Sequence, residues 1–266
     1  CFNQPLPMTG VAPFRYRLLA PALQSLIAPN VPEFTALMVD AAIHTLLVAI
    51  LLPSLFLWLH RWVSYDRAVT GILILAMCFT IAFNFYLPFG TTIIELVLLT
   101  VMLACIDRSF LIVVGLVILD SFNRETSLLL VAVYGVWHGW SGKNRTLILF
   151  AIWAAITVGL HVWLGPAPHI YGLAGTFEIN IGALSRSLIY NAPFVVLWIL
   201  TIKQYPKSQP KLKRLTWVAL VYAASVVVGA AWSEVRLLLP ILPLVMPIML
   251  RDETLETTDT ANIDAA

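Results

Sequence analysis

Long apolar stretches separated by short charged connections are the feature of this sequence that most constrains its fold. A helix needs roughly 20 apolar residues to cross the hydrocarbon core of a bilayer. Hydrophobic residues make up 60% of the chain and charged residues only 11%, whereas soluble domains carry roughly 25% charged residues. With this small number of charges, the chain cannot cover its whole surface with polar groups. Lipid must therefore form part of its solvent. The sequence predicts a multi-pass integral membrane protein.

The expected fold class is all-α, a polytopic transmembrane helical bundle. The apolar runs are continuous, whereas the strands of a membrane β-barrel alternate apolar and polar residues over about ten positions. We predict a single transmembrane domain over residues 1–250 and a disordered acidic tail over 251–266. The predicted spans are about nine, at 36–59, 68–87, 92–106, 109–122, 126–140, 146–164, 187–202, 215–232 and 235–250.

Positive charge divides sharply between the connections on the two sides of these spans. One set of alternate connections (60–67, 107–108, 141–145, 203–214 and the tail) holds 11 of the 16 Lys and Arg residues, including every Lys. Cytoplasmic connections carry an excess of Lys and Arg, so this set is expected to be cytoplasmic. The Lys-rich connection 203–214 reads as a topology signal, with a lipid head-group site as the alternative. We expect a protein of the bacterial inner membrane with its C-terminus in the cytoplasm.

Nine spans with a cytoplasmic C-terminus place residues 1–35 outside. This arrangement predicts a first span upstream of Cys1, with a lipid-modified Cys1 as the weaker alternative. Residues 13–29 are apolar but interrupted by Pro21 and Pro29, which is typical of a short helix lying on the outer interface. The three cysteines form no disulfide framework and no metal spacing, so we expect no cofactor; a divalent metal has no support in the sequence. A net charge of +2 gives no indication of a nucleic-acid partner.

The outer side carries five cations, and all of them are Arg. They are Arg15, Arg17, Arg124, Arg186 and Arg236. The planar guanidinium suits bidentate contact with phosphate or carboxylate. These groups predict an anion site shared between outer loops. The alternative is a set of structural Arg–Glu pairs.

The Asn123-Arg124-Glu125 group is the most informative of these. The apolar runs on either side are about 13 and 12 residues long, hence about 20 Å each, which is short of a core of about 30 Å. The tip of such a hairpin lies below the outer surface, where charges must line a polar cavity or pair with one another. We therefore predict that the tip, with Asp120, faces a pocket open to the outside. Glu95, near the outer end of its span, is another carboxylate at the membrane edge.

Three segments together resemble bacterial multi-pass proteins of the GT-C type, which are glycosyltransferases that use polyprenyl-phosphate sugars on the outer face of the inner membrane. The segments are Pro13–Pro21, Asn123–Thr126, and Glu234–Leu237 entering a proline-rich last span. The resemblance implies transfer of a sugar from a polyprenyl-phosphate donor, in contact with membrane lipid. It also implies substrate-binding residues, namely Arg15, Arg17, Arg124 and Arg236 on the phosphate, and Glu125 and Glu234 orienting these Arg side chains or binding sugar hydroxyls.

The catalytic acid of that family lies in the first outer loop, just after the first span. In this chain Glu33 and Asp40 are the nearby acids, and neither matches a motif, so the catalytic residue is open. Asp40 and His44 are spaced for an internal hydrogen bond or, less simply, a metal pair. Two other function classes remain open. One is a transporter or flippase for an anionic lipid or solute, and the other is a non-catalytic membrane subunit.

Overall fold

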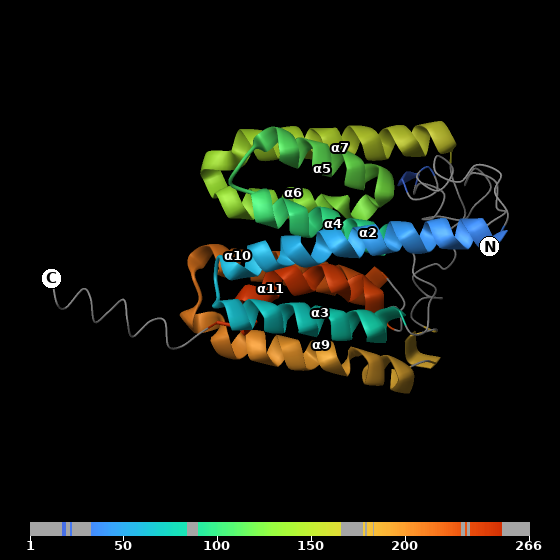
Figure 1. Cartoon of the computed structure of the whole chain (residues 1–266). Coiled ribbons are helices and arrows are strands. Elements are labelled where there is room, and N and C mark those ends of the chain that lie inside the picture. The colour runs from blue at the N-terminus through green and yellow to red at the C-terminus, as the bar shows by residue number, and fades with distance from the viewer. Residues whose placement is uncertain are drawn as a thin grey trace.

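The chain folds into a bundle of helices that run roughly parallel or antiparallel to one another (Figure 1), as described here from a computed structural model. The structure describes residues 18–19, 22, 33–83, 90–165, 178, 180–182, 184–229, 232 and 235–251. Over these residues it contains helices and turns and no strands, which confirms the all-α class. The α-helices are α2 (Glu33–His60), α3 (Tyr65–Phe83), α4 (Gly90–Cys105), α5 (Phe110–Asn123), α6 (Leu128–His138), α7 (Lys143–Leu164), α9 (Leu184–Gln204), α10 (Pro210–Gly229) and α11 (Leu242–Met249). Short 3-10 helices are η2 (Glu125–Ser127), η3 (Gly139–Gly142), η4 (Tyr205–Lys207) and η5 (Val235–Ile241).

Each of the nine predicted apolar stretches is helical over most of its described residues, and the exceptions lie at its ends. Four helical stretches are long and apolar enough to cross a membrane, namely Ala41–His60, Tyr65–Ala82, Glu125–Leu164 and Ser187–Lys207. The third of these has 40 residues and includes α6, α7 and the turn between them. Shorter apolar helices cover Thr91–Cys105, Phe110–Asn123 and Arg236–Met249. A multi-spanning membrane protein is therefore supported, and the number of nine crossings stays a prediction.

The interior of the bundle is formed by α4 and by the last helical segment. Every residue from 91 to 100 and from 239 to 250 is buried. The helix α4 packs against α2, α5 and η5, whereas α11 packs against α9, α10 and η5. Pro240, Pro243 and Pro247 lie in this last segment, and it begins as a seven-residue 3-10 helix before becoming α-helical. Proline removes backbone hydrogen-bond donors and disfavours a regular α-helix, in keeping with this change of helix type.

Large apolar side chains cover the outer surface of the bundle. Leu111 on α5 and Val162 on α7 are 77% and 78% exposed, and α3, α9 and α10 present similar residues. Soluble monomers rarely expose contiguous apolar surface of this extent. Lipid is the solvent that such a surface requires, so the pattern of exposure agrees with the composition.

All the connections predicted to carry the positive charge lie at one end of the bundle (Figure 1). We call this the basic end and define it by the connections 61–64, 106–109, 139–142 and 205–209 and by Arg251. Contacts between distant segments support the grouping. Arg61 pairs with Asp107 at 2.7 Å, Lys211 lies over the Trp137 ring at 4.7 Å, and Arg67 donates to the Leu250 carbonyl at 3.1 Å. The turn at 124–127 and the start of η5 lie at the opposite end, which we call the Arg124 end.

Three sequence predictions concerned the ends of the chain. The helix α2 begins at Glu33, so this residue belongs to a helix and not to an outer loop that continues to residue 35. The predicted interfacial helix at 13–29 lies outside the described residues except at Leu18, Leu19 and Ala22, where Ala22 N–H donates to the Leu18 carbonyl at 2.9 Å. The predicted disordered tail lies outside them beyond Arg251.

Candidate functional site

A cluster of polar side chains is buried at the Arg124 end, between the first turns of α4 and the end of α5. We call it the Arg124 cluster. Its members are Thr91, Thr92, Glu95, Asp120, Asn123, Arg124 and Thr126. Polar groups are costly in an apolar interior unless they bond to one another. Their concentration at one place therefore marks a site with a structural or a functional purpose.

An ion pair between Arg124 and Glu95 forms the centre of the cluster. Arg124 Nη1 lies 2.6 Å from Glu95 Oε2, and the two side chains are 4% and 0% exposed. The same nitrogen donates to Thr92 Oγ1 at 3.4 Å, and the Thr126 hydroxyl donates to Glu95 Oε1 at 2.6 Å. Both oxygens of the Glu95 carboxylate are therefore satisfied by hydrogen bonds across the gap between α4 and the 124–127 turn.

The local sequence explains why Arg124 points inward. The helix α5 ends at Asn123, and Arg124 takes an extended backbone (φ −157°, ψ 151°) while its N–H still donates to the Asp120 carbonyl at 2.8 Å. The chain then forms the single 3-10 turn η2 before α6 begins. Since α5 has 14 residues, it is about 21 Å long. The turn is thus held against α4, whereas its depth below the outer membrane surface stays a prediction.

Both hydrogen bonds of the Arg124 guanidinium leave from Nη1, and the buried Nε–H has no partner. The Nε–Nη2 edge of an arginine is one of the edges that can make a bidentate contact with a phosphate. The carboxylates whose charges act on Arg124 are Glu95, Asp120 and Glu125. Acidic groups therefore hold the guanidinium in place and leave one edge without a hydrogen-bonded acceptor.

Asp120 and Asn123 occupy the last turn of α5 and are both fully buried. The Asn123 Nδ2 group donates to the Thr91 carbonyl at 2.8 Å and to Asp120 Oδ1 at 3.0 Å. It therefore ties the end of α5 to the start of α4. Within the described residues Asp120 has no ion-pair partner, and the nearby Arg124 is paired with Glu95.

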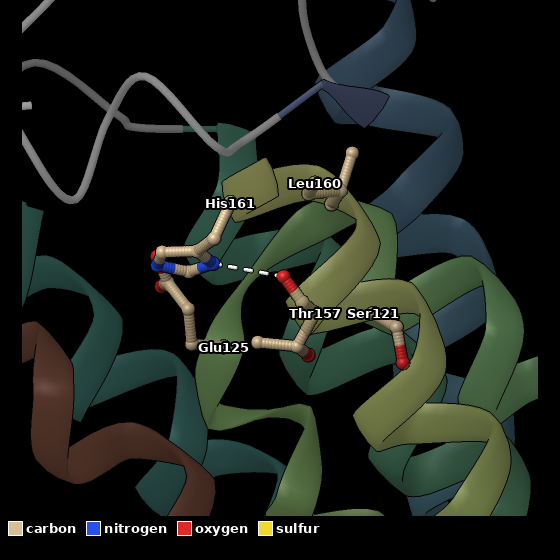
Figure 2. A pocket seen from close by; sticks show the side chains of 5 residues that line it. All are labelled: Ser121, Glu125, Thr157, Leu160 and His161. Carbon is tan, nitrogen blue, oxygen red and sulfur yellow. Dashed lines mark hydrogen bonds between the residues drawn. The ribbon is translucent and has the colours of Figure 1, made fainter. Parts of the chain in front are cut away.

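Glu125 lies beside the cluster, where its half-buried side chain lines a narrow crevice. Figure 2 shows the five lining residues, Ser121, Glu125, Thr157, Leu160 and His161, at the contact of the 121–125 stretch with α7. Within the crevice, His161 Nδ1–H donates to the Thr157 carbonyl at 2.8 Å. The Glu125 carbonyl accepts from Trp153 Nε1 at 3.2 Å. The crevice is too narrow to admit a water molecule, so the wide pocket predicted at the tip is not seen among the described residues.

Arg236 is the second predicted phosphate-binding residue that the structure describes. It is 4% exposed and lies near the start of η5, which packs against α4. The Arg124 end therefore contains two buried arginines on segments that share α4 as a neighbour. The structure shows no common cavity for them within the part of the chain that it describes. Glu234, predicted to orient this arginine, lies outside that part.

Arg15 and Arg17 also lie outside the described residues, but the residue after Arg17 is placed. Leu18 N–H donates to the Phe122 carbonyl at 2.9 Å. This bond attaches the N-terminal segment to the end of α5, two residues before Arg124. Convergence of Arg15 and Arg17 on the tip stays a prediction.

The acids considered for catalysis, Glu33 and Asp40, both lie on α2, and the structure does not describe their side chains. His44 lies one turn after Asp40, with its ring half-buried. No group of three or more His, Cys, Asp or Glu side chains that could hold a metal ion occurs among the described residues.

Sequence reasoning singled out Arg124 but missed the partner of its ion pair. Glu125, the sequence neighbour, was expected to serve this role, whereas the partner is Glu95 on α4. The signal was present, because Glu95 is the one charged residue between residues 68 and 106. A carboxylate within an apolar run of this kind requires a cationic partner.

At the basic end, Asp107 connects three segments. It accepts hydrogen bonds from Arg61 at 2.7 Å and from Trp137 Nε1 at 2.7 Å. Partial burial acts to raise the pKa of Asp107, but the bonds from Trp137 and Arg61 and the charges of Arg61 and Lys211 outweigh burial and lower this pKa. Asp107 therefore stays ionised and holds the basic end together.

Comparison of the chain with protein-family models, with characterised proteins and with solved structures finds no match. Function is therefore argued from the site.

Proposed function

We propose that this protein binds a polyprenyl phosphate at the Arg124 end and acts as a GT-C-like membrane glycosyltransferase on the outer face of a bacterial inner membrane. The observation that supports the proposal is the burial of two arginines, Arg124 and Arg236, at the end of the bundle that is poor in topology charges. Arginine at the outer side is not needed for orientation, because Lys and Arg act as topology signals on the cytoplasmic side.

The hydrogen bonding of Arg124 is compatible with phosphate binding. Glu95 fixes the guanidinium through Nη1 and leaves the Nε–Nη2 edge for an anion. Because Arg124 is 4% exposed, a phosphate reaches this edge only if a neighbouring segment moves. A phosphate in a partly dehydrated site gains about 1.5–3 kcal/mol from each charged hydrogen bond. The sugar-transfer part of the proposal rests on the resemblance of the three motif segments.

The test is binding of polyprenyl phosphate by the purified full-length protein and by the Arg124→Lys and Arg236→Lys variants. Lysine keeps the positive charge beside Glu95 but loses the planar fork. We expect each variant to bind roughly tenfold more weakly, or worse, which corresponds to about 1.5 kcal/mol or more. Arg108→Lys, at an exposed position of the basic end, is the matched control and should bind as the parent does.

Equal binding by all four proteins would leave Arg124 and Glu95 as a purely structural pair and would remove the reason for proposing a lipid-phosphate site. Weaker binding by both variants without any sugar transfer from a polyprenyl-phosphate sugar would favour the transporter or the non-catalytic subunit.

A further inference from the structure

Three oxygen atoms within the Arg124 cluster are buried and have no hydrogen-bond partner. They are Asp120 Oδ2, Asn123 Oδ1 and Thr91 Oγ1. Asp120 and Asn123 are 0% exposed and Thr91 is 8% exposed. Buried oxygens of this kind are rare in folded proteins and call for an explanation.

These three residues are joined through one nitrogen atom. Asn123 Nδ2 donates both to Asp120 Oδ1 and to the Thr91 carbonyl. The three unpartnered oxygens therefore belong to residues that the Asn123 amide links directly, through the Asp120 carboxylate and the Thr91 backbone carbonyl. Because Nδ2 donates to two acceptors, the orientation of the Asn123 amide is determined, and its remaining polar atom is the oxygen Oδ1.

Among the described residues, Asp120 has no ion-pair partner of its own. Arg124, the buried cation that contacts the cluster in this part of the chain, is paired with Glu95 at 2.6 Å. Asp120 is repelled by Glu95 and attracted by Arg124, and the repulsion is the larger of the two effects. Asp120 receives one hydrogen bond, from a neutral amide. An isolated buried carboxylate is costly, and within a membrane protein such a group marks an ion or proton site.

The ligand chemistry identifies the cation. Carboxylate, amide and hydroxyl oxygens are ligands for hard cations. One carboxylate together with neutral oxygens balances a single positive charge, whereas a divalent ion would bring an uncompensated charge into the interior. A proton on Asp120 would satisfy Oδ2 alone and leave two oxygens unpartnered. We propose that Asp120, Asn123 and Thr91 bind a sodium ion at the Arg124 end.

This inference is independent of the polyprenyl-phosphate proposal, and the probe is sodium itself. Thermal unfolding of the purified full-length protein is measured in NaCl and in choline chloride at equal ionic strength. We expect sodium to raise Tm with increasing concentration and choline to leave it unchanged. The Asp120→Asn and Thr91→Val variants should weaken the apparent sodium affinity roughly 10- to 100-fold, as is typical of changes around a metal site.

Two variants serve as controls. Asp107→Asn removes a carboxylate at the basic end and should keep the sodium response, even if its own Tm is lower. Arg236→Lys should weaken polyprenyl-phosphate binding and keep the sodium response, so the two proposals can fail separately. If Asp120→Asn does not fold, the sodium response of Thr91→Val tests the proposal in its place.

A wild-type Tm that is the same in sodium and choline would overturn the proposal. So would an unchanged sodium response in Asp120→Asn or, if that variant does not fold, in Thr91→Val. A Tm that depends on pH equally in both salts, without a sodium effect, would assign a proton to Asp120 in place of the ion.

Discussion

Arg124 contributes to this protein through its partner on another helix. Its ion pair with Glu95 lies at an end of the bundle where both side chains are almost completely buried. A buried pair of this kind adds little stability compared with apolar packing, but removing one partner leaves a charge without compensation. The pair therefore explains why a carboxylate is tolerated within α4.

The first prediction concerns that carboxylate. Glu95→Gln should lower the free energy of unfolding by about 3–5 kcal/mol, because it leaves the Arg124 charge buried and unpaired. Glu125→Gln is the matched control, since the Glu125 side chain is only half-buried and makes no ion pair with the described residues; its effect should stay within about 0.5 kcal/mol. Denaturant unfolding in detergent measures both. Equal effects of the two changes would contradict the assignment of Glu95 as the main partner of Arg124.

The second prediction concerns Asp107 at the basic end. Its folded pKa is lower than its ordinary value of 3.8, so it favours the folded state fully above the unfolded pKa, and this contribution disappears as the pH falls through the folded pKa. Asp107→Asn should therefore lower Tm at neutral pH and flatten its dependence on pH below about 4. Thermal scans from pH 3 to pH 7 test this. A variant whose Tm runs parallel to that of the parent down to pH 3 would contradict it.

Among the elements, the turn between α6 and α7 shows most clearly how the sequence sets the topology. Gly139 has φ +58° and ψ −143°, a conformation that side chains other than glycine avoid. A Cβ atom there would meet Arg214 Nη1 at 3.2 Å. Glycine thus allows a 40-residue apolar stretch to fold back as two packed helices.

The third prediction follows from this geometry. Gly139→Ala should destabilise the protein by about 1–3 kcal/mol, because alanine is strained at that backbone conformation. Gly159→Ala, in α7, is the matched control, since nothing lies within 4 Å of its Cβ position, and it should be neutral or stabilising by up to about 1 kcal/mol. Thermal unfolding of the two variants should move in opposite directions or by clearly different amounts. A neutral Gly139→Ala would mean that the turn does not depend on glycine.

The elements were predictable because each apolar run is a local property of the chain. The two short runs around residue 124 drew attention to the turn that carries Arg124, but its depth in the membrane stays a prediction. The last span is a 3-10 helix followed by a short α-helix, a change that its prolines favour but that the sequence did not specify. In contrast, the pairing of Arg124 with Glu95 depends on how α4 and α5 pack, 29 residues apart in sequence, and no local pattern specifies it. The absence of a wide pocket likewise depends on the packing of several helices.

On the scale of the whole molecule, the two ends of the bundle differ in their use of charge. At the basic end, Lys and Arg side chains lie on the connections or in the adjoining helix turns. Some of them contact aromatic rings, as Lys211 in the first turn of α10 contacts Trp137. At the Arg124 end, Arg124 and Arg236 are buried. The sequence predicted this division from alternate connections, and the fold places the basic connections together (Figure 1). Which end faces the cytoplasm stays a prediction.

The fourth prediction concerns that orientation. In single-Cys variants of a protein without its native cysteines, a Cys at Ser141 or Lys207 should be labelled by an impermeant reagent only after the cells are opened. A Cys in 165–186 should be labelled in intact cells. The excess of Lys and Arg on the first set of connections is the reason for this expectation. Labelling of position 207 from outside intact cells would reverse the assignment of both ends.

The central claim, a lipid-phosphate site at the Arg124 end, is tested most directly by photocrosslinking. A polyprenyl phosphate with a photoreactive group near the phosphate is added to the full-length protein in membranes, and the crosslinked peptides are identified by mass spectrometry. The account predicts crosslinks at the start of α4, at the 123–127 turn and at the start of η5, and their loss in Arg124→Lys. Crosslinks confined to the 203–214 connection, or crosslinks that Arg124→Lys leaves unchanged, would contradict it.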